Sequence, residues 1–171
     1  MKKLLSVLAS LVLVFSLTGC NAQATAATVS RVINGVVSVA EADLPALEAA
    51  GSFSKAEGDA VDHYLKFGLA LNSQFGVCAN ASGNAKAKLV ACLNAFSTGL
   101  ADPNELAALR VLNPNAQKQV QLYIVAFQVA INAALANFGA PAPAAPQVAS
   151  APVKSADLQE FKGRVMFALG R

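Results

Sequence analysis

The sequence predicts an all-α protein: a small helical bundle of about four main helices with short extra helices, a Pro/Ala-rich linker and a C-terminal amphipathic helix. Three observations support this fold class. Hydrophobic residues make up 55% of the 171 residues and charged residues only 13%. Alanine, which has the highest helix propensity, supplies about a fifth of the chain. Apolar residues also recur at helical spacing, between clear helix start signals.

The first helix is predicted over residues 24–42. Its apolar stripe is formed by Val29, Val32, Ile33, Val36, Val37 and Val39. These β-branched residues leave a strand as the alternative. Because proline disrupts a helix interior, we expect the helix to stop before Pro45, and a short helical turn to follow and end at Gly51.

The second helix is predicted to begin after Ser54, where Ser54 and Glu57 form a capping box, and to run to about Val77. Residues 80–84 read as a turn. A third helix is predicted over residues 85–98, with Gly99 as its stop.

Two further start signals follow. Asp102 and Pro103 are predicted to open a short helix that ends near Leu112. Asn113 and Pro114 are predicted to open the longest helix, which ends near Phe138. Its apolar seam has the spacing of bundle packing: Val120, Ile124, Phe127, Ile131, Ala134 and Phe138.

A narrow arc of amide side chains lies on the longest helix: Gln117, Gln121, Gln128 and Asn132. We expect this arc to be the solvent side of a central helix. The alternative is that it lines a ligand cavity or a partner groove inside the bundle.

The end of the chain has a different composition. Residues 140–153 contain four prolines among Ala, Ser and Gln, and we expect a mobile spacer that buries little surface. The last helix, within residues 154–171, is predicted from Ser155 to Leu169. Its apolar side either folds back on the bundle or docks elsewhere, and it is formed by Leu158, Phe161, Val165 and Leu169.

The chain opens with Met1, Lys2 and Lys3 and continues with an apolar run over residues 4–15, which is typical of a secretory signal. Residues 17–20 then read Leu-Thr-Gly-Cys. This segment resembles the lipobox of bacterial lipoproteins, in which Leu17, Thr18 and Gly19 are recognised by the signal peptidase. The resemblance implies a signal peptide over residues 1–19 and a diacylglyceryl group on Cys20, with acyl chains such as palmitate.

The same resemblance has consequences for localisation. It implies a protein of the cell envelope that is lipid-anchored through Cys20. In Gram-negative lipoproteins an Asp directly after the lipidated cysteine usually means retention in the inner membrane. Asn21 therefore resembles the residue found in lipoproteins of the outer membrane, which implies the periplasmic face of that membrane. Removing nineteen residues from 171 leaves 152, with residues 20–139 as the bundle, and the loss of Lys2 and Lys3 lowers the net charge from +3 to +1. Beyond residue 20 the sequence resembles no family.

With Cys20 lipidated, two cysteines remain in an oxidising compartment. We therefore expect a disulfide between Cys78 and Cys92, with two buried free thiols as the alternative. The bridge would join two consecutive helices near their turn.

Residues that often carry chemistry are few. His63 is the single histidine, and no serine or cysteine near it suggests a catalytic triad. We expect it to be half-exposed and hydrogen-bonded, one turn after Asp59. Asp59 and Asp62 each have a lysine one turn away, so we expect solvated ion pairs. The sequence thus predicts no catalytic residue, no metal ligand and no cofactor, and a chain that is not an enzyme.

We therefore expect a membrane-anchored protein with a binding or structural role. Its partner would be another envelope protein, docked by the apolar side of the last helix, and the low net charge argues against nucleic acid. The alternative function is a small carrier that holds a hydrophobic ligand within the bundle. Five phenylalanines, which we expect to fill the core, would then surround that ligand: Phe67, Phe75, Phe96, Phe127 and Phe138.

Overall fold

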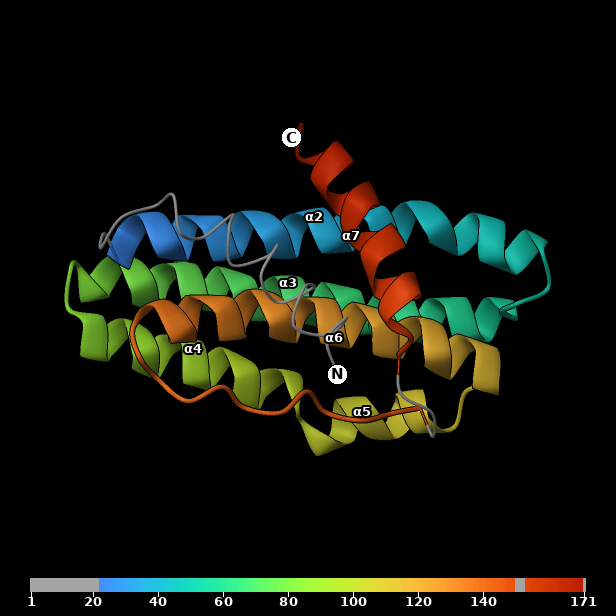
Figure 1. Ribbon diagram of the computed structural model, residues 1–171. Helices are drawn as coiled ribbons and strands as arrows, with labels where there is room; N and C mark the ends of the chain where they lie inside the picture. Colours follow the sequence, from blue (N-terminus) through green and yellow to red (C-terminus); the bar gives the residue numbers. More distant parts are fainter. Residues whose placement is uncertain (1–21, 150–152, 171) are drawn as a thin grey trace.

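The computed structural model describes residues 22–149 and 153–170 (Figure 1). This part of the chain is all-α, as predicted, and has no strand. Its helices are α2 (Ala22–Ala49), α3 (Lys55–Ser82), α4 (Lys86–Leu100), α5 (Pro103–Arg110), α6 (Pro114–Asn137) and α7 (Ser155–Ala168).

Four helices, α2, α3, α4 and α6, lie side by side with their axes roughly parallel, and α7 crosses over α2 and α6 at a steep angle (Figure 1). Helix α6 lies at the centre, where Tyr123, Phe127 and Ile131 are fully buried. In the described residues it is the one helix long and apolar enough to cross a membrane, but 67% of its most apolar stretch is buried inside the bundle. This burial is what a core helix needs.

The prediction of a helix break before Pro45 is wrong, because Pro45 lies inside α2. Proline removes the hydrogen bond to the carbonyl of residue 41. Glu41 and Pro45 are both exposed, so water can satisfy that carbonyl. The neighbouring Leu44 is buried, and its packing keeps the last turns of α2 on the bundle.

Two other boundaries differ from the predictions. Helix α3 continues past Val77 to Ser82, whose hydroxyl donates a hydrogen bond to the carbonyl of Cys78, and it ends at Gly83 with φ +56°. Gly99 lies inside α4 and does not end it. A Cβ at Gly99 would lie 2.7 Å from Leu71 Cδ2, so this glycine permits the close approach of α3 and α4.

The predicted start signals are confirmed. The Ser54 hydroxyl accepts from the Glu57 amide, and the Glu57 carboxylate accepts from the Ser54 amide, which completes the capping box. Asp102 caps α5, and Asn113 caps α6 by accepting from the amides of residues 115 and 116. Helix α6 also ends as predicted, directly before Phe138 and Gly139.

Glu57 has a second role that the capping motif does not show. Its carboxylate also accepts from the Asn113 backbone amide at 2.7 Å and from the Asn113 side chain at 2.9 Å, so it joins the starts of α3 and α6. The backbone amides of Ser54 and Asn113, with the Ser54 hydroxyl, lower the pKa of Glu57 to about 2.

Replacing Glu57 with Gln is expected to weaken the dependence of stability on pH in acid. Because the folded state lowers the pKa of Glu57 from its usual 4.5 to about 2, its contribution is complete above pH 4.5 and is lost as the pH falls through 2. The wild-type melting temperature should therefore fall more steeply over this window than that of Glu57→Gln. Glu41→Gln, on the exposed side of α2, is the control and should follow the wild type; parallel profiles for wild type and Glu57→Gln would contradict the prediction.

Cys78 of α3 and Cys92 of α4 lie at disulfide distance, with Cα atoms 5.9 Å apart and sulfur atoms 1.98 Å apart. The α3–α4 pair is an antiparallel hairpin, and the bridge joins its helices near their turn, as the sequence predicts.

Candidate functional site

The segment over residues 140–149 runs back along the bundle from the end of α6 towards α7 (Figure 1). The Gln121 side chain holds it at three points. Gln121 Nε2 donates to the Pro146 carbonyl at 3.0 Å, and Gln121 Oε1 accepts from the amides of Val148 at 2.7 Å and Ala149 at 3.3 Å. Gln121 thus fixes the linker, residues 140–149, to α6, and we call this set of three hydrogen bonds the clamp.

The other amides of the arc extend this network. Asn132 donates to the Pro143 carbonyl at 3.0 Å, and Gln128 donates to Asn132 at 2.8 Å while it accepts from the Ser97 hydroxyl at 3.1 Å. Gln117 donates to the carbonyls of residues 110 and 112. A proline-rich segment has carbonyls that need donors but few amides of its own, and the amide arc supplies those donors.

Two predictions are therefore wrong. The amide arc is not the solvent side of α6, because Gln121 is 0% and Gln128 is 2% exposed. It also lines no ligand cavity, because the chain's own linker occupies it. The linker in turn is not a spacer without buried surface, since Val148 is 6% exposed.

Replacing Gln121 with Leu is expected to lower the free energy of unfolding by about 2 kcal/mol, because the buried amide of Val148 then lacks its acceptor. It should also speed proteolytic cleavage within residues 140–149. Gln74→Leu, at an exposed position of α3, is the control for the same change in side chain. Equal stability and equal cleavage in the two variants would show that the clamp contributes nothing.

Helix α7 packs on its own bundle. Phe161 is 3% exposed and its ring centroid lies 5.3 Å from that of Tyr123, while Val165 and Leu169 lie against Gly35 of α2. A Cβ at Gly35 would be 3.0 Å from Leu169 Cδ2, so this glycine allows α7 to approach closely. Of the two interpretations left open by the sequence, the structure has the fold-back arrangement.

Two ion pairs join α7 to the bundle. Arg164 pairs with Asp43 of α2, and Asp157 lies 3.9 Å from Lys118 of α6. The hydrogen bond and charge of Asp43 raise the pKa of Arg164. Both pairs are partly exposed, so they orient α7 more than they stabilise it.

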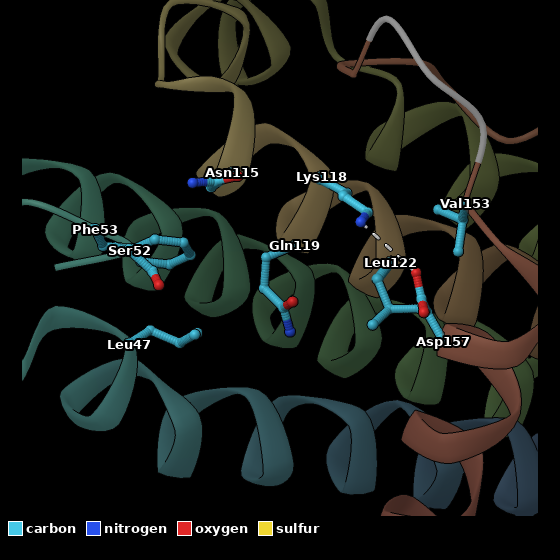
Figure 2. Close-up of a pocket in the computed structure, with 9 residues that line it drawn as sticks. All are labelled: Leu47, Ser52, Phe53, Asn115, Lys118, Gln119, Leu122, Val153 and Asp157. Carbon is cyan, nitrogen blue, oxygen red and sulfur yellow. Dashed lines mark ion pairs between the residues drawn. The ribbon is translucent and has the colours of Figure 1, made fainter. Parts of the chain in front are cut away.

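Two open clefts flank α7. The first has a volume of about 380 Å³ and lies between α6, the α2–α3 connection and the start of α7 (Figure 2). Figure 2 shows the Lys118–Asp157 ion pair at one side of it and Phe53 and Leu47 at the other. Its lining residues are Leu47, Ser52, Phe53, Asn115, Lys118, Gln119, Leu122, Val153 and Asp157.

The second cleft, of about 440 Å³, lies between α2 and the last turns of α7. Its walls include Val39 and Ala42 of α2 and Glu160, Arg164 and Phe167 of α7. The Phe167 side chain is 86% exposed, although the rest of the apolar side of α7 is buried or half-buried. Phe167 is the most exposed large apolar side chain of the described residues, and aromatic side chains are enriched among the residues that contribute most to protein–protein binding.

The residues considered for catalysis, Asp59, Asp62 and His63, lie within about one turn of α3 and pair with other charged groups. His63 Nε2 lies 3.2 Å from a carboxylate oxygen of Glu105 on α5, a partner that the local sequence does not indicate. Its side chain is 71% exposed. The predicted pairs Lys55–Asp59 and Asp62–Lys66 are present, at 3.0 and 2.6 Å.

The phenylalanines fill the core, as expected. The rings of Phe75 and Phe96 stack with centroids 5.7 Å apart, and Phe127 is fully buried against Gly68. Phe67 and Phe138 are half-buried and pack against the core. Phe75 and Phe96 also line a cleft of about 210 Å³ beside the Cys78–Cys92 pair, which lies between α3 and α4.

The lipobox residues Leu17, Thr18, Gly19 and Cys20 lie outside the described residues, as does the rest of the predicted signal peptide. Ala22, the first described residue, already belongs to α2. Comparison with known proteins finds no matching family model, no significantly similar curated protein and no significantly similar solved structure.

Proposed function

We propose that the chain is a lipid-anchored lipoprotein of the cell envelope that acts by binding and is not an enzyme. The lipobox at residues 17–20 supports the anchor, and the Cys78–Cys92 pair suits an oxidising compartment. Where the organism is Gram-negative, Asn21 favours the periplasmic face of the outer membrane. The observation that carries the binding role is the exposed Phe167 beside the cleft between α2 and α7.

The proposed partner is another envelope protein, and α7 is the element that meets it. Phe161 and Val165 are occupied by the chain's own bundle, so the contact is made by the outward side of α7 around Phe167. A photo-crosslinking residue placed at position 167 in intact cells should capture a specific protein. Position 111 is the matched control, because Val111 is also exposed, at 84%, but belongs to the connection between α5 and α6. Equal capture at both positions would contradict the proposal.

Replacing Cys20 with Ala is expected to abolish lipidation and to move the protein out of the detergent-extracted membrane fraction. Each buried methylene contributes about 0.8 kcal/mol to membrane binding, so two or three acyl chains anchor stably and none does not. Labelled palmitate should appear on the wild type only. Palmitate on the Cys20→Ala protein would overturn the proposed anchor.

A small carrier remains the second candidate function, and the cleft of Figure 2 favours it. Its volume of about 380 Å³ is in the range of small-molecule sites, and its lining combines the apolar Leu47 with the charged Lys118 and Asp157. Extracting the purified protein with organic solvent tests this function. An apolar molecule recovered in near-stoichiometric amount supports the carrier, and an empty extract argues against it.

A further inference from the structure

The acidic residues of the chain are confined to three segments. All ten Asp and Glu lie within residues 41–62, 102–105 and 157–160. Residues 22–40, 63–101 and 106–156 contain none, but they do contain lysines and arginines. We call these three segments without Asp or Glu the gaps. They are separate in the sequence, and the fold decides whether they lie side by side.

The fold brings a part of each gap to the same end of the bundle. The start of α2, the α3–α4 turn and the end of α6 lie together at the left of Figure 1. We call this the acid-free end and define it as residues 22–31, 76–91 and 131–139. The nearest carboxylate on α2 is Glu41, ten residues or roughly 15 Å beyond Arg31, and the nearest on α3 is Asp62, fourteen residues or roughly 21 Å from Gly76.

Cations are present at the acid-free end. Lys86 and Lys88 lie in the first turn of α4 and are exposed, and Arg31 is exposed on α2. Among the described residues no ion pair involves any of these three. By contrast Lys55, Lys66 and Lys118, which lie nearer the other end, each pair with an aspartate. Arg110 and Lys154 have no ion pair in the described part of the chain but have a carboxylate nearby in the sequence, Glu105 five residues before Arg110 and Asp157 three residues after Lys154. The positive charge of Lys86 and Lys88 is therefore not neutralised by the protein.

The acid-free end is also where the chain would meet its anchor. Ala22 is two residues beyond Cys20, and a fully extended chain spans at most about 3.6 Å per residue. A lipid on Cys20 would thus hold the start of α2 within roughly 7 Å of the headgroups. This link is too short to let the bundle move far from the surface, so the charges at this end decide how the bundle tilts about Cys20.

We propose that the acid-free end rests on the anionic phospholipid surface to which Cys20 is anchored, with Lys86 and Lys88 contacting the lipid phosphates. This inference rests on the proposed lipid anchor. The occupant is a phospholipid surface because the end combines unpaired cations, an absence of carboxylates and a short link to the lipid. The acidic half of the bundle, with α7 and Phe167, then faces away from the membrane and towards a partner.

The test uses the mature lipoprotein reconstituted into vesicles of phosphatidylcholine with one third phosphatidylglycerol. A fluorophore is placed on Ala87→Cys, between the two lysines, or on Val111→Cys, an exposed control position near the start of α6. With Cys20 lipidated and Cys78 joined to Cys92, the introduced thiol is the one that reacts. Headgroup-labelled lipid then quenches the probe in proportion to its proximity.

Quenching at position 87 is expected to exceed that at position 111 by at least severalfold, and to fall when salt is raised. Lys86→Gln with Lys88→Gln should weaken surface contact about 30-fold, since each lysine near an anionic surface contributes about fivefold. Lys55→Gln with Lys66→Gln, two exposed lysines nearer the opposite end, is the matched control and should leave the quenching at position 87 unchanged.

The outcomes separate the inference from the proposed function. Protein that floats with the vesicles but shows equal quenching at positions 87 and 111 overturns the orientation and leaves the anchor standing. Quenching at position 87 that survives Lys86→Gln with Lys88→Gln overturns the role of the lysines. Protein that does not float with the vesicles overturns the anchor itself, and the orientation falls with it.

Discussion

Replacing Phe161 with Ala is expected to lower the free energy of unfolding by about 3 kcal/mol or more, because truncating a buried phenylalanine leaves a cavity. Phe161 is 3% exposed and packs on Tyr123 of the central helix. A loss of this size should appear as a cooperative shift of the whole denaturant transition, since α7 contacts both α2 and α6.

Phe167→Ala on the same helix is the matched control. Its side chain is 86% exposed, so the change should stay within about 0.5 kcal/mol. Cutting the chain after Gly139 should destabilise the bundle further, because it also removes Val148 and the partners of Gln121. A truncated bundle with the full melting temperature would show instead that α7 docks reversibly, as the linker composition alone suggests.

Reducing the Cys78–Cys92 disulfide is expected to cost about 3 kcal/mol of unfolding free energy, because a bridge that closes a loop of this length restricts the unfolded chain. The melting temperature should fall on adding reductant. The double variant Cys78→Ser, Cys92→Ser should melt like the reduced wild type and should not respond to reductant.

Val77→Ser, at an exposed position next to Cys78, is the control for placing a hydroxyl on this part of α3 and should change little. The unfolded, non-reduced mature protein should react with no equivalents of a thiol reagent. Two equivalents would mean that the cysteines are free and that the bridge does not form.

Helix starts and the disulfide pair were predictable because their causes are local. A capping side chain bonds an amide two or three residues away, as Ser54, Asp102 and Asn113 do, and no tertiary information enters. Helix interruptions are different. Pro45 and Gly99 read as breaks, yet both lie inside helices. The burial of Leu44 beside Pro45 and the close approach of Leu71 to Gly99 outweigh a local preference of a few kcal/mol.

The sequence by itself determined the all-α class, the helix starts, the cysteine pair and the positions of the charges, since each follows from residues close together in the chain. Only the tertiary structure decided what the amides of α6 bond and where α7 lies. Gln121 and Pro146 are twenty-five residues apart, and nothing in either segment alone identifies the other as its partner. The same holds for the acid-free end, because three gaps in the acidic residues coincide only when antiparallel helices place them side by side.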